Sequence, residues 1–254
     1  MGKKNRTPEE NEKHEKKIER ILFRFVDITM WGSVIIIGIL IYFAPSEADA
    51  LRPYIRVKSD YTLMFVQSIL GIICLNLPGK IEKKWGVKIP SNMLIPFVIF
   101  LYCAIFLGEV RSFYYNVPHW DKLLHLFSAG MLGTLGFSTI SILNQSDRVP
   151  IHLSPLFIAV FAFCFALSLG AIWEIYEYTF DGFLGLNMQK FMTESGTQFV
   201  GRAALSDTMD DIITDALGAG VVAIVGYFSM KRYPAWVENM QLRMKQKQPT
   251  GQND

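Results

Sequence analysis

The sequence predicts an all-α protein, a polytopic transmembrane helix bundle with about six spans. Of its 254 residues 51% are hydrophobic, and the mean hydropathy is +0.26. The apolar residues are gathered in blocks long enough to cross a bilayer, which takes roughly 17–25 residues. Lys and Arg cluster beside these blocks, as they do at membrane flanks. A net charge of +2 is too small to indicate a nucleic-acid partner, so the expected environment is the lipid bilayer.

Six apolar blocks follow one another along the chain, at residues 26–44, 61–77, 92–108, 121–143, 154–178 and 210–230. This pattern divides the chain into a charged tail at 1–24, three helices within 25–112, three more within 119–230, and a basic tail at 231–254. The first tail is too long and polar for a signal-peptide n-region, so we expect the first helix to be retained. The motif "PGK" predicts the end of the second helix, and prolines near the start of the third are tolerated in an early turn.

The three cysteines all fall inside apolar blocks: Cys74, Cys103 and Cys164. This placement is typical of small buried hydrophobes and predicts neither a disulfide framework nor a zinc site. Small residues at helical spacing in the last three blocks, such as Gly218 and Gly226, predict that these helices pack closely.

The distribution of basic residues predicts that both termini are cytoplasmic. In that orientation 18 of the 25 Lys and Arg residues, Arg148 among them, fall in cytoplasmic segments. The loops at 111–120 and 182–209 are then extracytoplasmic. The aromatics of the first suit an interfacial belt. The second is rich in Gly and fits two alternatives equally, a lid or an amphipathic segment packed on the helix ends.

Acidic and histidine residues line one face of each of the last three helices, at the extracytoplasmic end. Helical spacing groups them as Asp121 with His125, Glu174 with Glu177 and Asp181, and Asp207 with Asp211 and Asp215. With a rise of about 1.5 Å per residue, His125, Glu174 and Asp215 each lie on the order of 6–8 Å below a helix end. Ionisable groups inside a span cost roughly 2.5–3.5 kcal/mol each, so groups at one depth indicate mutual pairing around a cavity.

The helix dipole separates these carboxylates into two classes. Capping could explain the acids at the start of the last helix, with Ser206 or Thr208 as the cap: Asp207, Asp210 and Asp211. It does not explain the acids at the end of the fifth helix, where the dipole disfavours anions: Glu174, Glu177 and Asp181. A positive group must compensate them, and the candidates are a metal ion, protonated His125, Lys122 or Arg202.

A histidine with carboxylates from two other helices could hold a divalent metal ion. The candidate ligands are His125, Glu174, Glu177, Asp211 and Asp215. In this interpretation Asp121 orients His125 from outside the ligand set, and Lys122 or Arg202 meets a phosphate or carboxylate. If hydrolysis occurs, Glu174 is the candidate general base. A proton-titrating network and a purely structural ion-pair knot are the alternatives.

Four motifs follow in order between residues 119 and 227. They are "WDKLLH" at a helix start, "ExxE" at a helix end, a loop with an Arg, and "DxxxDxxGAxxxxxxG". This order resembles the VanZ-like and YjdF-like families of small bacterial integral membrane proteins. The VanZ-like pattern matches at Asp121, Lys122, His125, Glu174, Arg202, Asp211 and Gly218. Glu177 stands where Gln is usual and Asp215 where Asn is usual, which makes this site more acidic.

The resemblance implies a bacterial cytoplasmic membrane and a link to the cell envelope, and it leaves the reaction open. The first functional hypothesis is therefore a site that binds or acts on an envelope lipid or lipid-linked precursor, with a divalent metal ion. A proton- or cation-coupled transporter and a non-enzymatic membrane scaffold are the alternatives. The sequence leaves the oligomeric state open.

Overall fold

The computed structural model describes residues 7–46, 56–144, 153–193, 197–232 and 243–244. Within these residues six helices are long and apolar enough to cross a membrane, which confirms the predicted all-α bundle. The elements are α1 (Pro8–Phe43), α2 (Lys58–Trp85), β1 (Val87–Lys88), α3 (Ser91–Leu101), η2 (Tyr102–Val110), α4 (Phe113–Asn116), α5 (Trp120–Asn144), α6 (Pro155–Leu184), η3 (Gly201–Leu205), α7 (Ser206–Arg232) and β2 (Arg243–Met244). Arg148 and most of the predicted tail at 231–254 lie outside the described residues.

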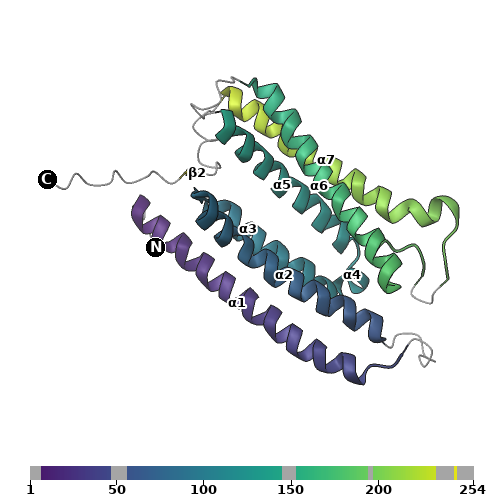
Figure 1. Ribbon diagram of the computed structural model, residues 1–254. Coiled ribbons are helices and arrows are strands. Elements are labelled where there is room, and N and C mark those ends of the chain that lie inside the picture. Colours follow the sequence, from purple (N-terminus) through teal and green to yellow (C-terminus); the bar gives the residue numbers. More distant parts are fainter. Residues whose placement is uncertain (1–6, 47–55, 145–152, 194–196, 233–242, 245–254) are drawn as a thin grey trace, which may run out of the picture.

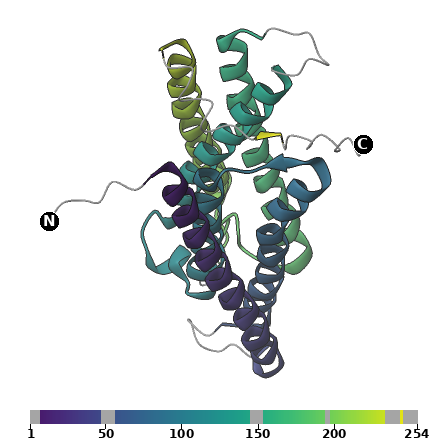
Figure 2. The same ribbon diagram turned by 90° about the vertical axis from the view of Figure 1, so that its left-hand side faces the viewer.

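The spans form two groups of three (Figure 1 and Figure 2). Helix α1 packs on α2 and α3, and α5, α6 and α7 each pack on the other two. Contacts of α3 and η2 with α5 join the groups. Helix α1 begins and α7 ends at one end of the bundle, while α4 and the loop after α6 lie at the other (Figure 1). The acidic stripes are carried by the second group.

Helix α1 begins at Pro8, well before the predicted start at residue 26. The Thr7 hydroxyl accepts a hydrogen bond from the Glu10 amide, and the Glu10 carboxylate accepts one from the Thr7 amide. This capping box starts a helix, and proline suits the first helical position. Much of the predicted charged tail is therefore a helical extension, with an ion pair of 2.8 Å between Glu12 and Lys16.

Helix α2 runs through the "PGK" motif to Trp85, so the predicted helix end at residue 77 is wrong. Pro78 lies inside the helix, where a proline removes a single backbone hydrogen bond. The residues that follow Gly79 are mainly Lys, Ile and Glu, which sustain the helix. The helix stops where Gly86 adopts a left-handed conformation with φ of 64°.

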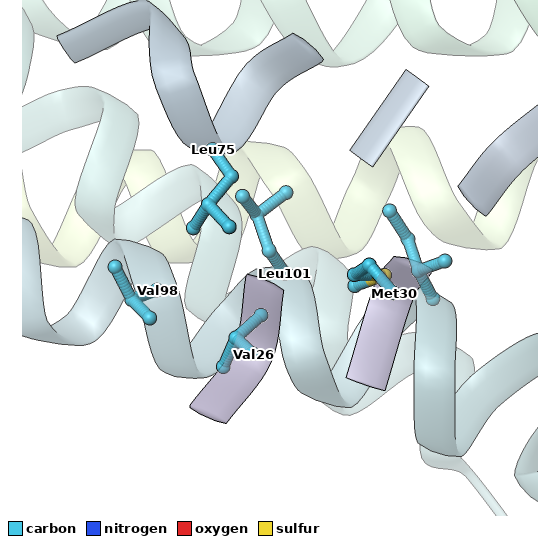
Figure 3. Packing of buried hydrophobic residues seen from close by; sticks show 6 residues of the cluster. Val26, Met30, Leu75, Val98 and Leu101 are labelled. Atoms are coloured by element: carbon cyan, nitrogen blue, oxygen red, sulfur yellow. The ribbon is translucent and has the colours of Figure 1, made fainter. Parts of the chain in front are cut away.

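The third span consists of α3 followed directly by η2, a π-helix. The amino-acid composition did not predict the change from α-helix to π-helix, because the two helices differ in the backbone groups that their amides hydrogen-bond to. The buried side chains of the first group meet here, with Val26 and Met30 of α1, Leu75 of α2, and Val98 and Leu101 of α3 in contact (Figure 3). Because η2 ends just before α4 and α5, the third span leads directly into the helices that carry Tyr114 and Asp121.

Close approach of backbones holds α5, α6 and α7 together. A methyl group placed on Gly218 of α7 would come within 2.6 Å of the Leu126 carbonyl oxygen of α5, and one on Gly136 within 3.0 Å of the Ala162 Cα. These glycines therefore let the three helices pack closely, as the spacing of small residues predicts.

We expect Gly218→Ala to lower the free energy of unfolding by about 1–3 kcal/mol, because the added methyl group forces α5 and α7 apart. Unfolding in mixed detergent micelles, followed by circular dichroism, measures this change. Gly32→Ala is the matched control, since a methyl group on Gly32 in α1 meets no atom within 4 Å. The control should be neutral or slightly stabilising. Equal effects of the two substitutions would contradict the packing argument.

Candidate functional site

The polar stripes of α5, α6 and α7 meet around the imidazole of His125. Its Nε2 atom lies 3.8 Å from an Asp121 oxygen, 3.9 Å from a Glu174 oxygen and 4.0 Å from an Asp211 oxygen. Its Nδ1 atom lies 3.3 Å from an Asp215 oxygen. Residues of three helices, up to more than 90 positions apart in the sequence, thus meet around one side chain.

The cluster is buried. His125 is 7% exposed, Glu174 is 4% exposed, and Asp211 and Asp215 are each 1% exposed. Charged groups withdrawn from water in this way need hydrogen bonds or opposite charges. Gly170 of α6 creates the space for one of them, because a methyl group at that position would collide with the Asp215 carboxylate.

Several of these buried carboxylate oxygens have no hydrogen-bond partner among the described residues. They are both oxygens of Glu174, Oδ1 of Asp211, Oδ2 of Asp215 and Oδ2 of Asp207. Buried polar groups in proteins are nearly always paired, so unpaired oxygens at one place indicate a proton or a cation there.

Three residues present donor atoms that a single metal ion could share. One atom each from Asp121, His125 and Asp211 lies within 4.8 Å of the others. One imidazole nitrogen with two carboxylate oxygens suits a divalent ion such as Zn²⁺ or Mn²⁺. The sequence predicted Asp215 as a ligand and Asp121 as the residue that orients His125. In the structure Asp121 offers a donor atom to this group of three, and Asp215 contacts the other nitrogen of the imidazole.

The other predicted ligands lie beside this group. Glu174 is within 3.9 Å of the imidazole and could complete a coordination shell. Glu177 is buried and accepts a hydrogen bond of 3.0 Å from the indole nitrogen of Trp173. The Trp173 contact holds Glu177 within α6 beside the ligand group.

The cation that enters the cluster is Lys190, which sequence analysis missed. Its ammonium donates hydrogen bonds to the carboxylates of Asp121 and Asp207. Burial lowers the pKa of Lys190, but the two carboxylates outweigh this effect and raise it above the ordinary value. Lys190 is therefore charged at neutral pH. The sequence does contain a signal for it, because residues 182–209 hold two cations, Lys190 as well as Arg202.

The two predicted cations lie elsewhere. Lys122 pairs with Asp210 at 2.6 Å, at an exposed edge of the cluster. Arg202 is exposed, and its guanidinium forms no ion pair with the described carboxylates. Both side chains lie near the start of α7, where a solvent-borne or headgroup anion could reach them.

Helix ends differ from the predicted positions, and this changes the dipole argument. Helix α6 continues to Leu184, so Glu174 lies ten residues before its end and only Asp181 is in the last turn. Helix α7 begins at Ser206, which places Asp215 nine residues inside it. At about 1.5 Å per residue these two groups lie about 14–15 Å from their helix ends, deeper than the predicted 6–8 Å.

The capping explanation is also incomplete. The Ser206 hydroxyl donates to the Arg202 carbonyl, and the Thr208 hydroxyl accepts from the Gln189 amide group, so neither caps α7. Asp211 lies more than one turn inside the helix and is fully buried. Capping therefore does not account for Asp211.

The loop after α6 is tied to the helices through its first residues. The Asp181 carboxylate accepts hydrogen bonds from the backbone amides of Met188 at 2.8 Å and Gln189 at 3.0 Å. The Gln189 side chain donates to Thr208 at 2.8 Å. Backbone amides thus compensate Asp181, and this part of the loop packs against the start of α7.

The first group of helices contributes Tyr114, from α4. Its ring packs against Gly108 of η2, in a space that a side chain at Gly108 would fill. Burial raises the pKa of the Tyr114 hydroxyl well above its ordinary value, and the carboxylates of Asp121 and Glu109 add to this effect. Tyr114 is therefore a neutral hydroxyl near the cluster, where the sequence suggested an interfacial aromatic.

Comparison with known proteins places the chain in a family. Residues 30–232, which include the later part of the first span, the other five spans and the cluster, match the predicted membrane proteins of DUF2238. The chain belongs to this family. An uncharacterised protein of Thermotoga maritima is similar to this DUF2238 member, with 27% identity over 153 residues that cover 59% of the chain and 69% of that protein. No solved structure matches the chain.

We expect Asp181→Ala to loosen the loop after α6, because the amides of Met188 and Gln189 lose a charged acceptor worth about 1.5–3 kcal/mol. Hydrogen exchange at these two amides should become roughly 10–100-fold faster, as measured by mass spectrometry. Asp210→Ala is the control, since Asp210 is exposed and contacts Lys122 rather than the loop. Unchanged exchange in Asp181→Ala would show that other contacts hold this segment.

Proposed function

We propose that the cluster binds a divalent metal ion through Asp121, His125 and Asp211, and that the protein uses this site to bind or act on the anionic headgroup of an envelope lipid or lipid-linked precursor. The observation that carries the proposal is the set of buried carboxylate oxygens without partners around one imidazole. Glu174, Asp211 and Asp215 are all more than nine-tenths buried and point to a missing positive charge.

The balance of charge supports a metal ion. Five carboxylates surround the site, from Asp121, Glu174, Asp207, Asp211 and Asp215. The described positive partners within it are Lys190 and, when protonated, His125. Negative charge therefore exceeds positive charge within a low-dielectric region. A divalent ion corrects the excess and is the largest local charge that such a site could hold.

The roles of the surrounding residues follow from their positions. Asp215 contacts Nδ1 of His125, as an outer carboxylate does when it orients a ligating imidazole. Glu174 is the general base in this proposal, because its carboxylate is buried beside the candidate ligands, 3.9 Å from the imidazole and next to the Thr208 hydroxyl. Lys122 and Arg202 at the edge of the cluster meet the phosphate or carboxylate of the headgroup.

The position of the cluster within membrane-spanning helices supports a lipid substrate. A headgroup at the bilayer surface is close to such a site, whereas a soluble substrate must enter it from water. The basic residues favour an extracytoplasmic position, and the resemblance of residues 119–227 to VanZ-like and YjdF-like proteins favours a bacterial envelope role.

The distribution of charge argues against a transporter that moves protons or cations across the membrane. Beyond the cluster, residues 126–144 of α5, 155–173 of α6 and 216–230 of α7 contain no Asp, Glu, Lys, Arg or His. Intramembrane ion pathways are normally lined by such residues. Apart from Lys231 and Arg232 in the last turn of α7, the charged residues of these three helices all lie at the end that holds the cluster, which suits a binding site.

Purified protein should contain about one divalent ion per chain, and His125→Ala and Asp211→Asn should lose it. Metal analysis by mass spectrometry and titration with Mn²⁺ or Zn²⁺ measure this loss. Asp215→Asn should weaken metal affinity about 10–100-fold, as loss of an outer partner does. Affinity should fall as the pH is lowered, because ligands must be deprotonated to bind.

Asp210→Asn is the matched control for the metal experiment. It removes a carboxylate next to Asp211 in sequence, but this one is exposed and paired with Lys122. It should retain the ion. If the wild-type protein binds no divalent ion at neutral pH, the proposed function is wrong.

An anionic lipid should remain bound to the metal-loaded protein in mild detergent and dissociate when a chelator removes the metal. Native mass spectrometry with added phosphatidylglycerol, and with phosphatidylcholine as control, measures this. Glu174→Gln should keep metal and lipid and accumulate to the wild-type level, because Glu174 acts in chemistry in this proposal. A large loss of folded Glu174→Gln protein would favour the scaffold alternative instead.

A further inference from the structure

Lys190 and the candidate metal ion would share a ligand. The Lys190 ammonium donates a hydrogen bond to one oxygen of Asp121, and Asp121 is one of the three residues whose donor atoms could hold a metal ion. The second carboxylate on Lys190, that of Asp207 at 3.1 Å, has its other oxygen buried without a partner. The ammonium thus lies inside the same acidic cluster as the proposed metal position.

Two cations on one carboxylate repel each other, and this repulsion is strong where little water screens it. Occupancy by one must therefore weaken the binding of the other. Such a coupling is reciprocal, so a metal ion that weakens the contact of Lys190 is itself weakened by Lys190 to the same extent.

The residues before Lys190 are held by other contacts, so the Lys190 side chain could leave the acidic cluster while the loop stays attached to α6 and α7. The amides of Met188 and Gln189 are held by Asp181, and the Gln189 side chain is held by Thr208. None of these contacts involves the Lys190 side chain. Residues 190–193 also have hydrogen bonds of their own, because the Lys190 amide donates to the Asn187 carbonyl at 3.2 Å and the Met192 amide donates to the Asn187 side chain at 3.1 Å. Lys190 itself has a φ of 45°, in the left-handed region that non-glycine residues seldom adopt. Release of its side chain would therefore allow the Lys190 backbone to return to a conformation of lower energy.

We propose that the Lys190 ammonium is an internal occupant of the cation site, and that a divalent ion displaces it and thereby loosens the hydrogen-bonded turn of residues 190–193 so that an anionic headgroup can enter. This inference rests on the proposed metal site and adds its regulation. The buried, unpartnered oxygen of Asp211, one of the three candidate ligands, marks a position for the incoming ion that Lys190 does not satisfy. The released ammonium then lies at the entrance, where it attracts the headgroup.

The test compares Mn²⁺ affinity in the full-length protein in lipid nanodiscs, by calorimetric titration. Lys190→Gln removes the competing cation and should bind Mn²⁺ about 5- to 150-fold tighter than the wild type, the usual range of coupling between two ligands. Lys190→Arg keeps the charge and should restore the wild-type affinity. Lys88→Gln removes an exposed cation that pairs with Glu12, far from the cluster, and should leave the affinity unchanged.

Hydrogen exchange of residues 190–193 gives a second measurement that needs no variant. Addition of Mn²⁺ to the wild-type protein should accelerate exchange there, while the amides of Met188 and Gln189 stay protected by Asp181. In Lys190→Gln the exchange should be fast before Mn²⁺ is added and should not increase further. The measurement on the wild-type protein tests the displacement of Lys190 even if Lys190→Gln folds poorly.

The outcomes separate this inference from the proposed function. If the wild type binds Mn²⁺ but Lys190→Gln binds it equally or more weakly, Lys190 is a structural partner and the inference is overturned while the metal site stands. Unchanged exchange of residues 190–193 on addition of Mn²⁺ to the wild type overturns it in the same way. If the wild type binds no Mn²⁺, both proposals are overturned.

Discussion

The second half of the molecule depends on one interaction, the contact of His125 with carboxylates of α5, α6 and α7. Asp121 lies on the same helix, Glu174 comes from α6, and Asp211 and Asp215 come from α7. Helices in a bilayer gain little from burying apolar surface against each other, so polar contacts and close packing have a large share in fixing their positions. The site and the packing of α5, α6 and α7 are therefore one arrangement, and a change to either alters the other.

Small residues make this arrangement possible. Gly170 provides the volume that the Asp215 carboxylate occupies, and Gly218 lets α7 approach the backbone of α5. Both lie next to residues with chemical roles in the proposal. The helices bring acidic groups together at the cost of unsatisfied oxygens, which is typical of sites that hold a ligand rather than of packing alone.

Much of the fold and the membership of the cluster could be predicted from periodicity. Spacing by three, four and seven residues placed Asp121, His125, Glu174 and Asp215 on inward faces, because a helix in lipid turns its ionisable residues toward other helices. Helix ends were less predictable. Apolar blocks end where residues leave the lipid, whereas α2 and α6 continue beyond that point for as long as hydrogen bonds and helix-forming residues allow.

Lys190 could not be placed from the sequence for a different reason. Its position depends on a loop conformation that the Asp181 contacts and a left-handed backbone create, and neither has a periodic signature. The positions of Asp121 and Asp215 beside different nitrogens of His125 have a similar cause. Both lie on the correct helix faces, but the orientation of the imidazole decides which one meets which nitrogen, and that orientation is a property of the assembled site.

The short pairing of β1 with β2 has a consequence for how the protein can move. Val87 pairs with Met244 and Lys88 with Arg243, which joins the segment between α2 and α3 to a strand that follows α7. Any movement that carried this segment away from the strand would have to break the pairing of these four residues. A two-residue strand near the end of the chain thus adds a contact to the turn that joins two membrane spans.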